Sequence, residues 1–323
     1  MRQTRRSLLG AFAALSLAKA SAASQPPWPG ALTMGTGLPG GSFTIFGPAW
    51  GQLIAQATGI DLAYRSTDGS CANLLLIEQG SIELGLCSLP AAIQAHTGTG
   101  DWTAGARMEQ FRVLFPTYPS ILQIVAPENG ARTLAELAHQ PIGAGPSAIQ
   151  PASLGQIFTN LGIHPSRIEK GNYAQQLTQL MRGELAACAF FGAPPVPAIK
   201  DVATRNKLRL IGFSDAQARQ ATCLVPGLSH MLLKAGTFPG LTVDVSSIGT
   251  VDLAIGTVAL PDSLVKTATL TALQHRAELG AMVPAAEDSL SLKCIQEAGL
   301  PFHDGAIKAL HQFGYRGKLS ASA

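Results

Sequence analysis

Two turns rich in glycine and hydroxyl side chains give the N-terminal part of the sequence the composition of an anion-binding site. The first, TGLPGGSFTIFG at residues 36–47, follows a short apolar run and precedes a segment with helical character. Gly37 and Gly41 permit positive φ angles and a close approach of the backbone to a ligand. Ser42 is expected to cap a helix that begins near Phe43, and the start of that helix would present free N–H groups and a positive dipole end.

A second turn, RSTDGSCANL at residues 65–74, repeats this order of strand, hydroxyl-rich turn and helix start. Ser70 is its expected N-cap, and Asn73 can add a side-chain donor. A third turn, GAGPSAIQPASLG at residues 143–155, contains Ser147. Helix N-termini that meet in one cleft can hold a carboxylate without arginine. The three turns therefore predict a cradle for a carboxylate or another polar ligand.

Other interpretations of these turns are a nucleotide-binding loop, an enzyme site or ordinary connections between strand and helix. The sequence has no G-x-x-x-x-G-K-[ST], and its opening glycines do not fit G-x-G-x-x-G with an acidic residue in the usual frame. It also lacks G-x-S-x-G, H-E-x-x-H and any acid–histidine cluster with metal-ligand spacing, so we expect no metal, no cofactor and no enzymatic activity. A hydrolase with Ser70 or Ser147 as nucleophile stays open, although neither has an assignable base. The interpretation that these glycine turns only join strands to helices also stays open.

Residues 1–22 have the pattern of a cleavable export signal. Basic residues precede an apolar stretch from Leu8 to Ala18, and Ala20-Ser21-Ala22 fits the small-x-small cleavage rule. The stretch is shorter than the roughly 20 apolar residues that span a bilayer. Arg5-Arg6 resembles a twin-arginine signal, with the general secretion route as the alternative. We therefore expect a periplasmic protein.

Charge and length limit the function classes further. The full chain has 23 basic and 20 acidic residues, but four of the basic residues belong to the export signal, which leaves 19 against 20. No clustered positive field of the kind that binds nucleic acid remains. Charged residues make up only 13% of the chain. The roughly 300 residues after the signal are enough for two lobes.

The cysteines do not form a recognisable framework. The chain has 5 cysteines, an odd number, and none lies in a C-x-x-C pair. No spacing matches a zinc site, so most are expected to be buried apolar residues. A disulfide between Cys71 and Cys87, the nearest pair in sequence, stays open.

The hydrophobic pattern predicts two series of alternating strands and helices. The first begins at Ala31, and a crossing segment with two strand-like runs, residues 111–127, leads into the second. Return strands at residues 242–261 contain the apolar run Ile248 to Leu260, which carries Asp252 and is interpreted as buried strand. Residues 262–323 are expected to be mostly helical, with His303 as a structural residue at a helix start. Alternation of this kind favours parallel sheets covered by helices, and two such lobes leave a cleft for a small ligand.

From about Leu32 to Tyr315, the sequence resembles a known family, the TAXI subfamily of TRAP-transporter solute receptors. The first landmark is Thr36-Gly37 with Gly41-Ser42-Phe43, and the second is residues 66–80, similar to the family's STGGSxxNLxxIxxG. The third is FHDGA at residues 302–306, similar to HPGAxxYY. The chain departs from the pattern where Asp68 replaces a glycine. If Asp68 points into the cleft, it would repel a second carboxylate and favour an amino group.

The resemblance implies an α/β, two-lobed type II periplasmic-binding-protein fold in which each lobe is a mostly parallel sheet flanked by helices. The expected lobes are residues 31–120 with 245–323, and residues 121–244. The chain would deliver a small carboxylate-bearing solute, an organic acid or amino acid, to a TRAP-type membrane permease. A receptor that signals to a membrane sensor kinase is the alternative. The expected ligand-binding residues are Thr36, Gly37, Gly41, Ser42, Phe43, Thr67, Ser70, Asn73, Ser88 at a strand end, Tyr118 in the crossing segment, Ser147 and Phe191.

Overall fold

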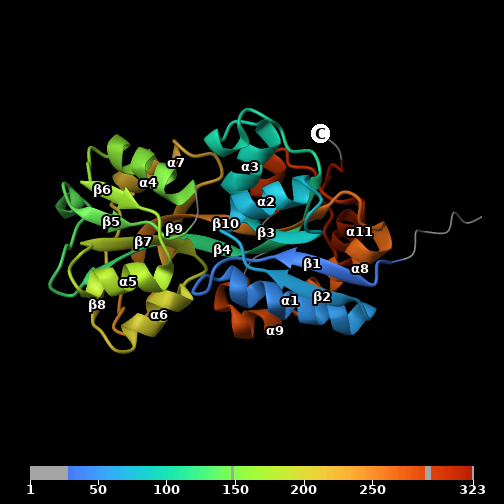
Figure 1. The fold of residues 1–323 in the computed structure, drawn as a ribbon, viewed down its shortest axis with the longest axis horizontal. Helices are drawn as coiled ribbons and strands as arrows, with labels where there is room; N and C mark the ends of the chain where they lie inside the picture. The colour runs from blue at the N-terminus through green and yellow to red at the C-terminus, as the bar shows by residue number, and fades with distance from the viewer. Residues whose placement is uncertain (1–27, 147–148, 288–291, 322–323) are drawn as a thin grey trace, which may run out of the picture.

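Two lobes are joined by a pair of long strands that run through both of them (Figure 1). The computed structural model describes residues 28–146, 149–287 and 292–321, so the predicted export signal lies outside the described residues. The strands are hydrogen-bonded in the order β2-β1-β3-β10-β4-β7-β5-β6, with β8 paired to β4 and β9 to β10. The long strands β4 (Phe111–Pro127) and β10 (Val245–Thr257) are antiparallel to each other.

The first lobe is built on three parallel strands in the order β2-β1-β3. In the view of Figure 1, α2 and α3 lie above this sheet and α1 and α9 below it. The elements of the lobe are β1 (Ala31–Gly35), α1 (Phe43–Thr58), β2 (Asp61–Arg65), α2 (Ser70–Glu78), β3 (Leu84–Ser88), α3 (Leu89–Thr97), the short helix η1 (Asp101–Thr103), α8 (Asp262–Gln274), α9 (Arg276–Met282), η3 (Pro284–Ala286), α10 (Lys293–Glu297) and α11 (Asp304–Gln312).

The second lobe repeats this plan with the parallel order β6-β5-β7. Helices α4 and α7 lie above its sheet and α5 and α6 below it (Figure 1). Its elements are η2 (Ala135–Leu137), β5 (Pro141–Gly143), α4 (Ile149–Asn160), β6 (Arg167–Glu169), α5 (Tyr173–Met181), β7 (Ala187–Gly192), α6 (Pro197–Ala203), β8 (Leu208–Leu210), α7 (Asp215–Thr222) and β9 (Ser229–Leu233). The prediction of two lobes alike in plan is confirmed, while the boundaries at residues 120 and 245 stay a prediction.

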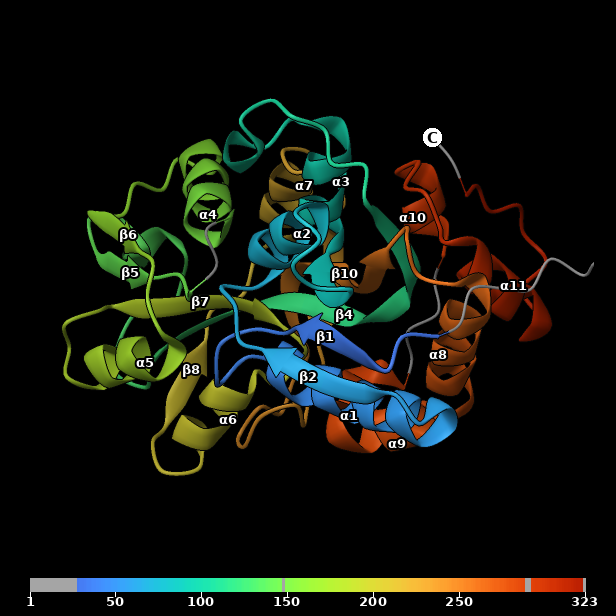
Figure 2. The same ribbon diagram turned by 45° about the vertical axis from the view of Figure 1, so that its right-hand side comes forward.

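The segment at residues 111–127 forms one strand, β4, which passes between the lobes (Figure 2). Its pairing with β10 shifts register, because Val251 lies opposite Pro119 whereas Leu253 lies opposite Pro116. A bulge is where a strand tolerates proline, since proline has no N–H to donate to a neighbouring strand. The shift leaves Asp252 opposite the bulged part of β4.

The core of the first lobe is anchored by Trp50 of α1, whose side chain is fully buried. The Trp50 ring lies edge-on to Phe115 of β4, with ring centroids 5.2 Å apart. Its Nε1 donates to the carbonyl of Ala268 in α8 at 3.0 Å. This one residue therefore holds α1 to a crossing strand and to a helix from the C-terminal part of the chain. Among the cysteines, Cys71 and Cys87 are buried free thiols, so the structure has no disulfide between them.

His303 starts α11, as the sequence predicts. It is 3% exposed, and its Nδ1 accepts from the backbone N–H of Gly305 at 3.2 Å while Nε2 contacts the carbonyl of Leu260 at 3.1 Å. Burial lowers the pKa of His303, although the Asp262 carboxylate opposes the shift. Only an Nδ1 without a proton can accept the cap hydrogen bond, so the folded state needs the neutral ring.

We expect the stability contributed by His303 to be full above pH 6.5 and to fall as the pH drops below that value, because the unfolded chain then binds a proton that the folded chain resists. His303→Asn keeps a capping acceptor without a titratable ring. The variant should have a flatter dependence of unfolding free energy on pH between about 5 and 7. Urea unfolding of both proteins across this range tests the prediction, and identical slopes would contradict it.

Candidate functional site

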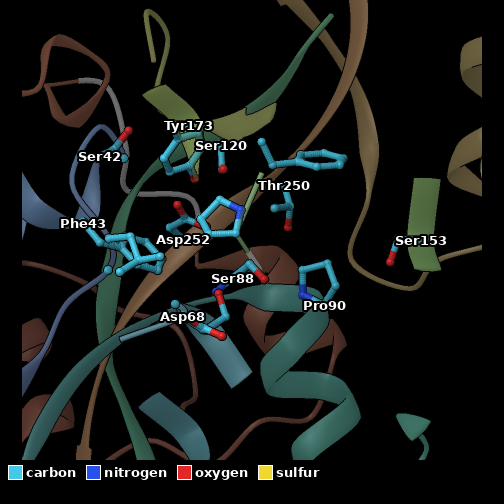
Figure 3. Close-up of a pocket in the computed structure, with 18 of the residues that line it drawn as sticks. Ser42, Phe43, Asp68, Ser88, Pro90, Ser120, Ser153, Tyr173, Thr250 and Asp252 are labelled. Atoms are coloured by element: carbon cyan, nitrogen blue, oxygen red, sulfur yellow. The ribbon is translucent and has the colours of Figure 1, made fainter. Parts of the chain in front are cut away.

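A cavity of about 100 Å³ lies where the two lobes meet, and residues of both lobes line it (Figure 3). An internal cavity of similar size, about 150 Å³, is large enough for benzene. The starts of several helices border it: Phe43 of α1, Ser70 of α2 and Tyr173 of α5 are first helical residues, and Ser88 immediately precedes α3. The backbone N–H groups and dipoles at these helix starts favour a negatively charged group nearby.

The opening glycine turn contributes Gly37, Gly41, Ser42 and Phe43 to the cavity wall. The same turn also makes direct contact with the second lobe. Ser42 precedes α1, but its hydroxyl does not cap the helix; it accepts from the backbone N–H of Ala193 at 3.0 Å. A Cβ at Gly41 would lie 3.1 Å from the Tyr173 ring. The glycines therefore let the second lobe approach closely, a role that composition alone does not reveal.

The second turn depends on Gly69, whose φ of 94° lies in the region that favours glycine. Gly69, and not Ser70 as predicted, is the N-cap of α2. The Ser70 hydroxyl instead accepts from the backbone N–H of Ser88 at 3.0 Å, which joins the start of α2 to the start of α3. Ser70 and Ser88 both line the cavity, as does Phe191 at the end of β7 in the second lobe.

Asp68 lies at the cavity wall and forms an ion pair with Lys170 of the second lobe, with Nζ and Oδ2 2.6 Å apart. Both side chains are about half exposed, at 52% and 46%. Exposed pairs of this kind contribute about 0 to 1 kcal/mol to stability. The pair is therefore better suited to bridging the two lobes than to holding the fold together.

Thr36, Thr67 and Asn73 do not line the cavity, and their expected role in ligand binding stays a prediction. They form a buried network behind it: the Asn73 amide nitrogen donates to the carbonyls of Thr36 and Leu86 at 2.9 and 2.8 Å, and the Thr67 hydroxyl contacts Asn73 Oδ1 at 2.8 Å. These bonds tie the ends of β1 and β3 to α2. The polar groups of Asn73 are thus engaged by the protein itself.

Two further predicted residues are not found in the described cavity wall. Tyr118 is fully buried, and its ring packs edge-on against Phe46 at 5.2 Å, behind the cavity. Ser147 lies outside the described residues. In that region the described second-lobe residues Pro146, Ser153 and Tyr173 contribute to the wall.

The residue that sequence reasoning missed is Asp252, together with Ser120 and Thr250 of the crossing strands. Asp252 is 3% exposed, and Figure 3 shows it among wall residues that include Ser120 of β4, Tyr173 of α5 and Ser88 at the end of β3. Burial raises the pKa of Asp252 well above its ordinary value, and a hydrogen bond from Ser120 opposes the shift in part. The sequence did contain a signal that could have indicated Asp252 as a site residue: it is a single acidic residue within a strand expected to be buried.

The remaining wall is aromatic and aliphatic and has no cationic side chain. None of the described residues that line the cavity is Lys, Arg or His. Within the described part of the chain, no group of His, Cys, Asp and Glu is placed to hold a metal ion. The described serines of the wall likewise have no histidine or lysine among the other lining residues.

Solved structures with the same architecture define the fold of the chain. A protein from Bordetella bronchiseptica matches with a TM-score of 0.51 and 11% identity, over 91% of this chain and 92% of its own. An amino acid ABC transporter substrate-binding protein from Streptococcus pneumoniae, solved with bound L-arginine, matches with a TM-score of 0.50 and 14% identity, over 80% and 94%. The fold is the α/β type II periplasmic-binding-protein fold, as predicted.

A family model described as the NMT1-like family matches residues 34–314, so the chain belongs to that family, the TAXI-type substrate-binding proteins of TRAP transporters. The predicted family is thereby confirmed. The chain is a solute-binding protein of a transporter, and its family is one of binding proteins rather than enzymes, which removes the hydrolase alternative. The family is typically extracytoplasmic. Across the described residues, no helix has both the length and the apolar character needed to cross a bilayer.

Replacing Asn73 should affect the fold before it affects binding. Asn73→Ala leaves two buried carbonyls without their donor, which is expected to lower the free energy of unfolding by about 1 to 3 kcal/mol. Ser88→Ala removes a hydroxyl from the cavity wall and should change that free energy by less than about 0.5 kcal/mol. Urea unfolding without solute measures both. An Asn73→Ala protein of unchanged stability that fails to bind solute would restore Asn73 as a ligand contact.

Proposed function

We propose that the protein captures a small carboxylate-bearing solute, an organic acid or an amino acid, in the periplasm and delivers it to a TRAP-type membrane permease. The chain would reach the periplasm through the export signal in residues 1–22, which is then removed. The observation that carries the proposal is the cavity between the lobes, bordered by the starts of α1, α2 and α5. A carboxylate is one of the anions that such N–H groups bind without a basic side chain.

The contacts between the lobes support a mechanism in which closure retains the solute. The carbonyl of Gly40 accepts from the N–H of Ala198 at 3.1 Å, and the Ser42–Ala193 hydrogen bond and the Asp68–Lys170 ion pair also cross between the lobes. Opening the lobes would break these few polar contacts, whereas β4 and β10 would bend and stay paired. Hinge movement of this type is common in two-lobed binding proteins. The closed form would then be the one that the permease receives.

Thermal unfolding of residues 23–323 against a panel of small solutes tests the function. The panel contains amino acids, aliphatic and aromatic monocarboxylates, dicarboxylates, keto acids and sugars. A bound solute stabilises the folded state by about 2.7 kcal/mol at a hundredfold excess over its dissociation constant. We expect a rise in midpoint temperature with members that carry a carboxylate. Stabilisation by sugars alone, or by no solute, would contradict the proposal.

Closure is tested by adding bulk where the lobes meet. Gly41→Val places a side chain against the Tyr173 ring and should weaken solute binding at least about tenfold, because the lobes can no longer close. The solute-free protein should keep its midpoint temperature, since it can stay open. Gly30→Val is the matched control, because a Cβ at Gly30 has nothing within 4 Å. Equal solute affinities of the two variants in calorimetric titration would argue against closure at this contact.

A further inference from the structure

The carboxyl group of Asp252 occupies an unusual position at the centre of the binding protein. It lies in β10, opposite Ser88 of β3 on one side and the bulged part of β4 on the other. The side chain is 3% exposed and belongs to the cavity wall, as Figure 3 shows. Both lobes share the strand that carries it, so its place does not depend on which lobe moves.

Among the residues that the structure describes, none of the groups that face Asp252 is a cation. Ser120 of β4 makes a hydrogen bond to its carboxyl group. The titratable groups whose pKa values respond to its charge are Tyr118 of β4, Tyr173 of α5 and Cys87 of β3, and burial raises all three values, so each is neutral near pH 7. Lys170 approaches the cavity, but it is paired with Asp68.

A buried carboxyl group without a positive partner is costly to the fold. Ionised acidic groups in protein interiors are normally paired, and perturbed ones without a structural partner concentrate at functional sites. The Ser120 hydrogen bond satisfies part of the carboxyl group and leaves the rest directed to the cavity. The missing partner is therefore expected from the solute.

We infer that Asp252 binds the protonated amino group of the solute, so that the protein selects small amino-bearing solutes over carboxylates that lack an amino group. This inference rests on the proposed function and adds the substrate class. The helix starts on the first lobe would hold the carboxylate of an amino acid, and Asp252 would hold its ammonium group. The walls formed by Phe43, Phe191 and Leu228 would enclose an apolar side chain.

Dicarboxylates do not fit this arrangement. Their second negative charge would lie in a cavity that also contains Asp68 and would oppose the ionisation of Asp252, and no basic residue among the described lining residues would offset it. A zwitterion instead supplies one charge of each sign, which matches a cavity with N–H donors at one part of its wall and a carboxyl group at another.

The proposal has a defined dependence on pH. In the empty cavity burial favours the neutral acid at Asp252, whereas an ammonium group favours the carboxylate. Binding of an amino-bearing solute therefore releases a proton, and the affinity rises with pH until Asp252 is ionised in the free protein. A carboxylate held by a protonated Asp252 would show the opposite dependence, with affinity rising as the pH falls.

Calorimetric titration of residues 23–323 with matched solutes tests the inference. The amino acids L-leucine, L-phenylalanine and L-glutamine are each compared with the acid that lacks the amino group: 4-methylpentanoate, 3-phenylpropanoate and 4-carbamoylbutanoate. The amines 3-methylbutylamine and 2-phenylethylamine show whether the ammonium group suffices without a carboxylate, and glutarate represents the dicarboxylates. We expect the best amino-bearing solute to bind at least about tenfold more tightly than its partner acid, and more tightly as the pH rises from 5 to 7.

Two variants locate the effect. Asp252→Asn keeps the shape and removes the charge, and it should reduce this preference for the amino group by about tenfold or more. Asp68→Asn removes the other acid of the wall and should leave most of this preference intact, because Asp68 is half exposed and already paired with Lys170. If Asp252→Asn fails to fold, the pH dependence of the solute affinity of the unsubstituted protein still tests the inference.

The outcomes separate the two proposals. Tighter binding of the acids without an amino group, or a loss of preference in Asp68→Asn but not in Asp252→Asn, would overturn the inference and leave the carboxylate receptor standing. Binding of the amines alone, with no amino acid or carboxylate bound, would support Asp252 and contradict the carboxylate cradle. No binding by any of these solutes would count against both.

Discussion

The antiparallel pairing of β4 with β10 is the constraint on which the rest of the structure depends. These two strands continue both sheets, since β3 pairs with β10 and β7 pairs with β4. Both lobes must therefore meet along one line, and the cavity forms there. The bulge opposite Asp252 also belongs to this pair, so the same strands that join the lobes carry the buried acid into the site.

The glycine turns have two physical roles that the structure distinguishes. Gly69 provides a backbone conformation that other residues rarely adopt, and α2 begins directly after it. Gly41 provides space instead, because a side chain there would press against Tyr173 of the second lobe. Gly40 combines both roles, since its φ is 93° and a side chain there would press against Ala198. The polar residues near the turns also have two roles. Ser70 and Ser88 line the cavity, whereas Thr67 and Asn73 form hydrogen bonds that hold the strands together behind it.

Much of the fold could be predicted from local pattern. The helix expected to begin near Phe43 does so, and the strand–helix alternation gives two sets of three parallel strands within one continuous sheet. The site was predicted less completely. Tyr118 lies in the crossing strand and has a suitable chemistry, yet its ring is buried against Phe46 and is not part of the wall. Ser120, two residues along the same strand, reaches the cavity.

The sequence by itself determined the family, through its resemblance to the family's motifs, and the two-lobed plan, through local periodicity. It also singled out the turns before α1 and α2, which line the cavity. The tertiary structure alone decided which polar side chains face the cavity, since that depends on strands far apart in the chain. Ser88, Ser120 and Asp252 come from three such strands, and only the register of β10 between β3 and β4 brings them together. That register places Asp252, the acidic residue of an otherwise apolar segment, in the cavity wall.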